Sequence, residues 1–331
     1  MHHGVITYSR NAFLPLTTVC RNRCGYCCFR TPVQEGCIIS PKEVLHTLDS
    51  SRELGCTEAL FTFGERPEIE SGFTKYLEAF GYFTILDYCY DMCIAAIDRG
   101  LLPHTNAGIM TYDEMERLKD VNASMGLMLE TTAHVSAHAN SPGKDPAVRI
   151  EMIENAGRLK IPFTTGLLLG IGESVQDREK SLEVIKDLHK RFGHIQEVII
   201  QNFCPKEGTP MEHYPAPGND VMHDTIRMAR EILPPDVSVQ IPPNLADAKD
   251  LVTCGVNDLG GISPVTIDYV NPEHPWPQIN ELKKVAGDFT LRERLCIYPQ
   301  YIRKGWYSEK LETIIKKLEQ DLNLNINYSE I

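Results

Sequence analysis

Three cysteines near the start of the chain have the spacing of an iron–sulfur site. Cys20 and Cys24 are separated by three residues, and Cys24 and Cys27 by two. Three thiolates on one short loop can bind three irons of a four-iron cluster, which leaves the fourth iron free to bind a substrate or cosubstrate. A protein that only carries electrons usually ligates all four irons. The spacing therefore predicts a catalytic 4Fe–4S cluster on Cys20, Cys24 and Cys27.

Two other interpretations of these cysteines stay open, namely a structural zinc ion and chance. Structural zinc takes four ligands, usually in two pairs. Cys28 follows Cys27 directly, so the two side chains would diverge on an extended backbone, whereas Cys37 could reach back. Either could also have a role near a cluster. The remaining cysteines are interpreted as buried small apolar residues; they are Cys56, Cys89, Cys93, Cys204, Cys254 and Cys296.

The elements that must position this loop alternate along the chain. Apolar and β-branched runs predict eight strands, at residues 14–19, 58–63, 102–106, 124–130, 163–169, 197–202, 238–241 and 258–262. Helical spacing and start signals predict helices between them, at residues 41–55, 71–99 with a break near 82, 146–159, 174–192, 220–233 and 245–253, and another that begins at Thr111. Two of these helices begin with capping boxes, at Ser40 and Thr111.

This alternation predicts an α/β fold, a parallel (β/α)8 barrel of the TIM type, over residues 1–262. Residues 263–331 are rich in proline and end in a predicted helix at 308–322. We expect them to form a C-terminal extension that packs on the barrel and not an independent domain. The cysteine loop follows the first predicted strand, which places it at the mouth of the barrel, where barrel enzymes keep their chemistry.

Polar side chains at the predicted strand ends face the same mouth. Together they indicate a neutral substrate rich in hydroxyl or carbonyl groups, since no cluster of Lys or Arg suited to a phosphate stands among them. Each alone could equally be a structural hydrogen-bonding residue. The substrate-binding candidates are Asn106, Gln201, Asn202 and Asn244, and the candidate catalytic bases are Asp258 and His134.

Composition excludes several other classes of protein. The 331 residues include 33 basic and 45 acidic side chains, a net charge of −12, which argues against nucleic-acid binding. No apolar run is long enough for a membrane span, and residues 1–4 lack the features of a secretory signal. We therefore expect a cytoplasmic protein that acts on a small molecule.

A CxxxCxxC loop after the first strand of a barrel resembles the radical S-adenosylmethionine enzymes, and the resemblance covers residues 13–262. It implies S-adenosylmethionine as cosubstrate and an external one-electron reductant. Phe63-Gly64-Glu65 is similar to the Gly-Gly-Glu element of the family, with Phe63 in place of the first glycine. In that family the element receives the methionyl ammonium group, which assigns this role to Gly64 and Glu65. Glu65 could instead be a solvated turn residue.

The resemblance implies further cosubstrate contacts. Glu130 stands where the family often holds the ribose hydroxyls, although it could instead pair with an arginine of the barrel. We expect Arg149 to bind the methionyl carboxylate, unless it is a surface residue of its helix. Gly166 to Glu173 resembles the GxIxGxxE element near the adenine, which adds Gly166, Gly170 and Glu173 to the cofactor-binding candidates.

Several blocks resemble one subgroup, the CofG-type deazaflavin synthases; they are residues 24–30, 63–68, 140–146, 201–203 and 275–277. In that subgroup a CofH-type radical enzyme joins tyrosine to a ribityl-diaminouracil. The CofG-type enzyme then closes the central ring through a 5′-deoxyadenosyl radical and releases ammonia, a lyase reaction of the EC 4.3.1 class. The alternatives are a sister radical enzyme (biotin-synthase-like, CofH-type or of the menaquinone pathway) and a non-catalytic iron–sulfur or zinc protein.

Overall fold

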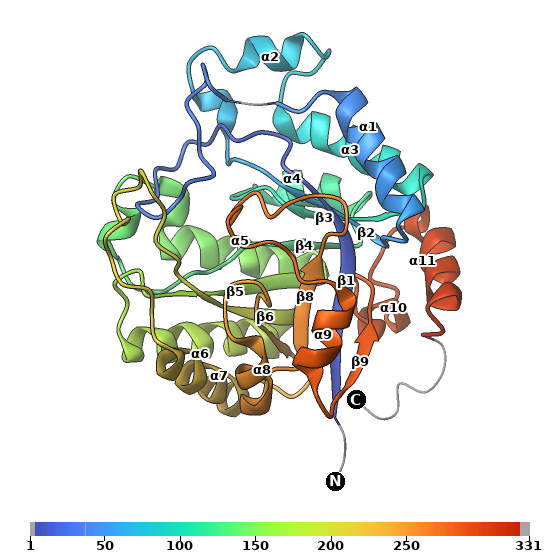
Figure 1. Cartoon of the computed structure of the whole chain (residues 1–331). Helices are drawn as coiled ribbons and strands as arrows, with labels where there is room; N and C mark the ends of the chain where they lie inside the picture. The colour runs from blue at the N-terminus through green and yellow to red at the C-terminus, as the bar shows by residue number, and fades with distance from the viewer. Residues whose placement is uncertain (1–3, 37, 325–331) are drawn as a thin grey trace.

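The fold of the chain is a closed barrel of eight parallel strands with helices around its outside (Figure 1). The structure is a computed structural model, and it describes residues 4–36 and 38–324. The strands pair in chain order from β2 to β8, and β1 closes the barrel by pairing with both β8 and β2. The predicted barrel is therefore confirmed. Its strands are β1 (Val5–Leu14), β2 (Glu58–Thr62), β3 (Leu102–Asn106), β4 (Ser124–Gly126), β5 (Phe163–Leu169), β6 (Ile195–Asn202), β7 (Ser238–Gln240) and β8 (Asp258–Ile262).

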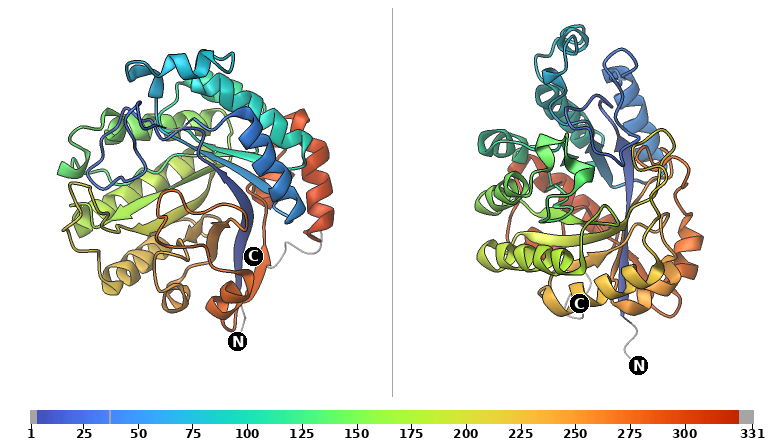
Figure 2. Two further views of the ribbon diagram at one scale, coloured as in Figure 1. Left: turned by 45° about the horizontal axis from the view of Figure 1, so that its top comes forward. Right: turned by 90° about the vertical axis from the view of Figure 1, so that its left-hand side faces the viewer.

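The helices cover the outer face of the strands, as the two further views show (Figure 2). Those within the barrel repeat are α1 (Pro41–Glu53), α2 (Thr74–Glu78), α3 (Ile85–Asp98), α4 (Tyr112–Lys119), α5 (Pro146–Arg158), α6 (Val175–Phe192), α7 (Asn219–Ile232) and α8 (Ala248–Leu251). Both capping boxes form, with Ser40 paired to Glu43 and Thr111 to Glu114. Among the described residues, no helix combines the length and apolar character that crossing a membrane requires.

The first strand differs from the prediction. It spans Val5–Leu14, and residues 15–19, which were predicted to be strand, form only isolated bridges at Thr17 and Val19. The strand was missed because its inner face carries polar residues instead of apolar ones. The hydroxyls of Thr7 and Ser9 donate to the carboxylates of Asp258 and Glu58, on the neighbouring strands β8 and β2.

The fourth strand is also shorter than predicted. It ends at Gly126, and Glu130 forms only a single bridge to Leu167. The backbone of Glu130 has a φ of 67°, a left-handed conformation that side chains other than glycine rarely adopt. This turn ends the pairing and sets Glu130 at the mouth of the barrel.

The C-terminal residues close the amino-terminal end of the barrel. They form α9 (Ile279–Ala286), β9 (Thr290–Glu293), α10 (Pro299–Arg303) and α11 (Glu309–Asp321). The strand β9 was not predicted, and it pairs in parallel with the first half of β1. Figures 1 and 2 show α11 beside α3, where Lys310 bonds Tyr90.

A buried ionic network forms the floor of the barrel. Arg294, which follows β9, donates to Asp258 at 2.5 and 2.7 Å and to Glu197 at 2.7 Å. The hydroxyl of Tyr298 donates to both carboxylates at 3.0 and 3.1 Å. Asp258 begins β8 and is fully buried. Its predicted position at the mouth is therefore wrong, because the strand starts with this residue and runs away from it.

Candidate active site

The three cysteines of the CxxxCxxC loop lie at the mouth, and each sulfur receives hydrogen bonds. The backbone N–H of Glu65 donates to Cys20 Sγ at 3.2 Å, and the hydroxyl of Ser141 donates to Cys24 Sγ at 3.3 Å. Backbone N–H groups of Phe29 and Arg30 face Cys27 Sγ. Burial raises the pKa of the Cys27 thiol to about 11 and also raises that of Cys20. The three thiols are free and half-buried.

These residues fit an iron–sulfur cluster. Thiolates on one loop that receive hydrogen bonds from N–H and O–H groups are the usual surroundings of such clusters. Cys28 turns away, since its thiol donates to the carbonyl of Val270. Cys37 lies outside the described residues. Among the described residues, no group of three or more His, Cys, Asp or Glu side chains is placed to hold one metal ion. A cluster differs from such a site, because each thiolate binds a different iron.

The cysteine loop is held in place by backbone hydrogen bonds from three sides. Arg21 N–H donates to the Glu65 carbonyl at 2.9 Å, and Gly25 N–H donates to the Ala137 carbonyl at 2.8 Å. The third tie comes from the loop after β6, where Met211 N–H donates to the Gly25 carbonyl at 3.0 Å. These three hydrogen bonds hold the loop against the end of β2, the segment around Ala137 and the loop after β6.

Gly64 lets the end of β2 approach this loop closely. Its N–H donates to the Thr17 carbonyl at 2.9 Å, and a Cβ at this position would collide with the carbonyl of Val19. Glu65 is 3 % exposed; it accepts from Arg21 Nε at 2.6 Å and from the Ile109 N–H at 2.9 Å. In this structure Gly64 and Glu65 support the cysteine loop, and Glu65 is not a solvated turn residue.

Glu130 lies in a cluster of titratable groups beside the cysteine loop. It forms an ion pair with Lys144, and the hydroxyl of Tyr26 lies 3.1 Å from His138 Nε2. Burial raises the pKa of Glu130, but the charges of Lys144 and Arg149 outweigh it and hold the pKa below its ordinary value. Burial lowers the pKa of His138 to about 4, so the imidazole is neutral near pH 7.

Sequence reasoning missed Lys144 and His138 as members of this site. Lys144 is within the block 140–146 that carried the family resemblance, but no strand end marked it. His138 follows the end of β4 by twelve residues, so it could not be assigned to the mouth from strand positions. A proline-glycine turn before Lys144 was the only available signal, because it returns the chain towards Glu130.

Arg149 is buried and is not a surface residue of its helix. Its Nε donates to the Gly143 carbonyl at 2.8 Å, and its Nη1 donates to the Met128 carbonyl. The third nitrogen, Nη2, has no hydrogen-bond partner among the described residues. Arg149 can therefore still bind a carboxylate beside Glu130.

The glycine-rich loop after β5 is organised by its own glutamate. Gly170 has a φ of 92°, and the carboxylate of Glu173 accepts from the N–H groups of Gly170 and Ile171 at 2.9 to 3.1 Å. Arg178 donates to the same carboxylate at 3.0 Å. On the strand, Gly166 leaves room for the neighbouring Met128 side chain. The carboxylate of Glu173 is therefore engaged by its own loop and by Arg178. The rest of the loop backbone is available to a ligand.

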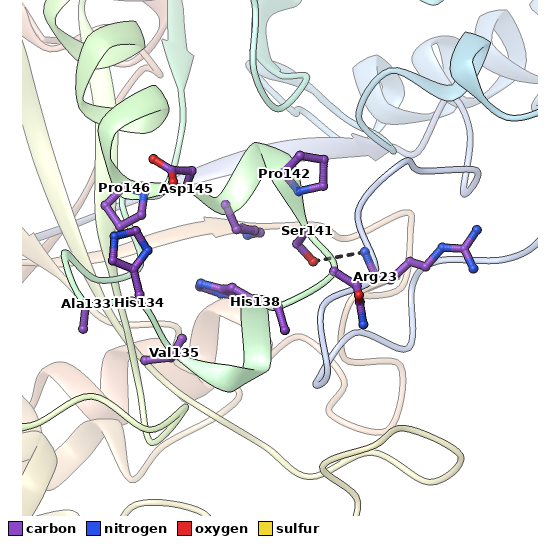
Figure 3. A pocket seen from close by; sticks show the side chains of 12 residues that line it. Arg23, Ala133, His134, Val135, His138, Ser141, Pro142, Asp145 and Pro146 are labelled. Atoms are coloured by element: carbon purple, nitrogen blue, oxygen red, sulfur yellow. Dashed lines mark hydrogen bonds between the residues drawn. The ribbon is translucent and has the colours of Figure 1, made fainter.

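A cavity of about 780 Å³ opens next to the cysteine loop. Figure 3 shows it between Arg23 and His134, with the Ser141 hydroxyl bonded to the Arg23 backbone. His134 is exposed there, which places one of the two candidate bases beside the site. Lys144 and His138 also line this cavity.

The four substrate-binding candidates divide into two pairs. Asn106 and Gln201 lie at the mouth ends of β3 and β6 and are half-buried. Asn202 and Asn244 instead take part in loop packing. Asn202 donates to the Leu245 carbonyl at 3.1 Å, and Asn244 donates to Asp268 at 3.0 Å.

A barrel with this cysteine loop at its mouth defines a radical S-adenosylmethionine enzyme, and residues 14–185 match the family described as the Radical SAM superfamily. Curated relatives extend the match to nearly the whole chain. The protein of Methanoculleus marisnigri is 70% identical over 97% of both chains, and that of Archaeoglobus fulgidus is 52% identical over 95% of this chain and 96% of its own. The chain belongs to the family of these relatives, the 7,8-didemethyl-8-hydroxy-5-deazariboflavin synthases.

Solved structures share the fold at low sequence identity. The FeFe-hydrogenase maturase HydG from Carboxydothermus hydrogenoformans gives a TM-score of 0.71 at 18% identity, covering 96% of this chain and 74% of its own. Methylornithine synthase PylB gives a TM-score of 0.65 at 16% identity, covering 94% of this chain and 86% of its own. At these identities the likeness concerns the fold alone.

Proposed function

We propose that this chain converts the tyrosine–ribityldiaminouracil adduct into 7,8-didemethyl-8-hydroxy-5-deazariboflavin by closing the central ring with release of ammonia. The observation that carries this proposal is the 70% identity to a curated deazariboflavin synthase over 97% of both chains. The reaction belongs to the carbon–nitrogen lyases. A CofH-type enzyme would supply the adduct, and a one-electron donor would supply the electron.

The cysteines hold the cluster in this proposal, and the residues around them hold the cosubstrate. When bound, the cluster and S-adenosylmethionine supply a 5′-deoxyadenosyl radical that takes one hydrogen atom from the adduct. Glu130 would accept hydrogen bonds from the ribose hydroxyls, because Lys144 and Arg149 keep it ionised. Nη2 of Arg149 would bind the methionyl carboxylate.

The glycines of the β5 loop would allow the adenine to approach the backbone, with Gly166 on the strand and Gly170 in the turn. Of the two candidate bases, His134 is the one beside the cavity. Asp258 is fully buried at the floor of the barrel, where Arg294 donates to its carboxylate, and it does not line the cavity. We therefore retain His134 as the candidate base for the proton and ammonia losses.

The test is product analysis with purified, cluster-reconstituted protein under anaerobic conditions. The sequence holds one CxxxCxxC triad, so it should carry out one radical event. With tyrosine and ribityl-diaminouracil alone it should make no fluorescent deazaflavin, and adding a CofH-type enzyme should give product, even across a dialysis membrane. Product from this chain alone would refute the division of labour. Absence of product with the partner would favour a sister radical enzyme.

The same assay tests the non-catalytic alternative. A protein that holds its cluster only for structure or electron transfer would not cleave S-adenosylmethionine after reduction with dithionite. We also predict a cytoplasmic location and a transient association with the CofH-type enzyme.

A further inference from the structure

Four carboxamide side chains on the inner face of the barrel have no hydrogen-bond partner among the described residues. They are Asn11 on β1, Asn106 on β3, Gln201 on β6 and Gln240 on β7. Asn11 is 2 % exposed and Gln240 is 8 % exposed, and the Oδ1 atom of Asn11 is fully enclosed without a partner. The Asn11 carbonyl oxygen therefore loses its hydrogen bonds to water and gains none from the protein.

The alternation along each strand places these amides inside the barrel. Ser9, two residues before Asn11, donates at 2.8 Å to Glu58, whose carboxylate is close enough to Arg294 of the floor network for that charge to lower its pKa. Glu197, four residues before Gln201, accepts from Arg294. Because side chains on a strand alternate between its two faces, Asn11 and Gln201 share the inner face with these floor residues. Asn11 lies one layer nearer the mouth than Ser9, and Gln201 lies two layers nearer the mouth than Glu197.

Glycines on neighbouring strands let three of the amides lie along the barrel wall. A Cβ on Gly126 would collide with the side chain of Asn106, one on Gly260 with Gln240, and one on Gly261 with Asn11. Each amide therefore lies over the glycine of the adjacent strand and does not extend across the barrel. This arrangement presents the polar edges of the amides on the inner wall of the barrel.

We propose that these four amides, above all Asn11 and Gln240, bind the pyrimidinedione ring of the substrate inside the barrel. A carboxamide can form two hydrogen bonds at once with the adjacent N–H and C=O of a pyrimidine edge, as asparagine and glutamine do with nucleobases. The four side chains are uncharged, so they suit a neutral cyclic ureide and not a phosphate. This inference rests on the proposed function, and it names which part of the substrate lies where.

The experiment measures binding of ribityl-diaminouracil, the pyrimidine part of the adduct, by calorimetry. It uses cluster-reconstituted protein with S-adenosylmethionine under anaerobic conditions. Asn11→Leu and Gln240→Met remove the amides at similar volume, and Gln176→Met on exposed α6 is the matched control. We expect each amide variant to bind about tenfold more weakly or worse, and the control to be unchanged.

A second measurement separates a binding role from a structural one. If the amides serve the ligand, replacing them with apolar groups removes an unsatisfied polar group, so the unfolding temperature of the ligand-free variants should stay equal or rise. Iron content and affinity for S-adenosylmethionine should not change. Lower unfolding temperatures in both variants, or unchanged pyrimidine affinity in both, would overturn the inference, as would a wild-type protein that does not bind the pyrimidine.

Failure of this inference and failure of the proposed function give different results. If wild type and both variants close the adduct equally well, the function stands and the amide site is wrong. If wild type binds the pyrimidine through these amides but does not close the adduct, the site stands and the proposed reaction is wrong.

Discussion

Replacing Glu58 by Gln should stabilise the protein at alkaline pH and not at acid pH. Glu58 is 5 % exposed, and its carboxylate accepts from the Ser9 hydroxyl at 2.8 Å. Burial raises its pKa from 4.5 to about 7, even though Arg294 and Ser9 oppose the rise. Glutamine keeps an acceptor for Ser9 and removes the charge.

The size and sign of the effect follow from proton binding. Between pH 4.5 and about 7 the folded protein holds a proton on Glu58 that the unfolded chain has released, so stability falls as the pH rises through this window. Above about pH 7 the whole penalty is present. At 1.36 kcal/mol per pKa unit, the rise corresponds to roughly 3 kcal/mol. We expect Glu58→Gln to be more stable than wild type by that order at pH 8, and by little at pH 5.

Urea unfolding of reconstituted wild type and variant from pH 5 to pH 8.5 measures this difference. Glu179→Gln, on the exposed face of α6, is the matched control and should change stability little at any pH. A variant that is less stable than wild type at pH 8, or a stability difference that does not depend on pH, would refute the reasoning. Either result would mean that the Arg294 charge holds Glu58 ionised in the folded protein.

Three further predictions concern the site. Cys20→Ala, Cys24→Ala or Cys27→Ala should each abolish turnover and reduce bound iron. Cys89→Ala should keep both, since Cys89 is a buried residue of α3 whose thiol contacts Thr105 on β3; iron and sulfide analysis checks this. Gly64→Ala should displace the Val19 carbonyl and lower cluster occupancy. Gly25→Ala should retain the cluster, because the added Cβ would lie 3.4 Å from its nearest neighbour, an ordinary contact distance. Equal iron content in the two variants would contradict this packing argument. Lys144→Met should weaken S-adenosylmethionine binding about tenfold or more, because Glu130 loses its ion-pair partner; unchanged affinity in anaerobic titration would exclude this role.

The elements that sequence reasoning predicted best are those with an apolar inner face or a strong start signal. The bounds of β3 and β5 agree with the predicted ranges, and both capping boxes form. Local chemistry alone decides a capping box, and a run such as Phe163–Leu169 is buried on both faces. Such features need no knowledge of distant residues.

The site could be predicted only where its residues are contiguous. The cysteine triad is one loop, so its spacing was visible. Gly64 was identified through the family resemblance, but its need for glycine comes from contact with Val19, 45 residues earlier. Gly25, inside the loop, does not have a left-handed backbone, and a Cβ added there would meet its neighbours at an ordinary contact distance. The glycine that the packing requires is therefore Gly64 and not the one between the cysteines.

The polar face of β1 explains both the missed strand and the design of the barrel. Thr7 and Ser9 bind the floor carboxylates, Asn11 has no protein partner, and the strand then leads into the cysteine loop. One strand therefore contributes in turn to the stability of the floor, to the proposed substrate layer and to the cluster loop. A barrel interior that holds a polar substrate must carry polar residues at the positions where an apolar pattern would have marked a strand. The failure to predict β1 thus has the same physical cause as the proposed binding of a neutral polar ring.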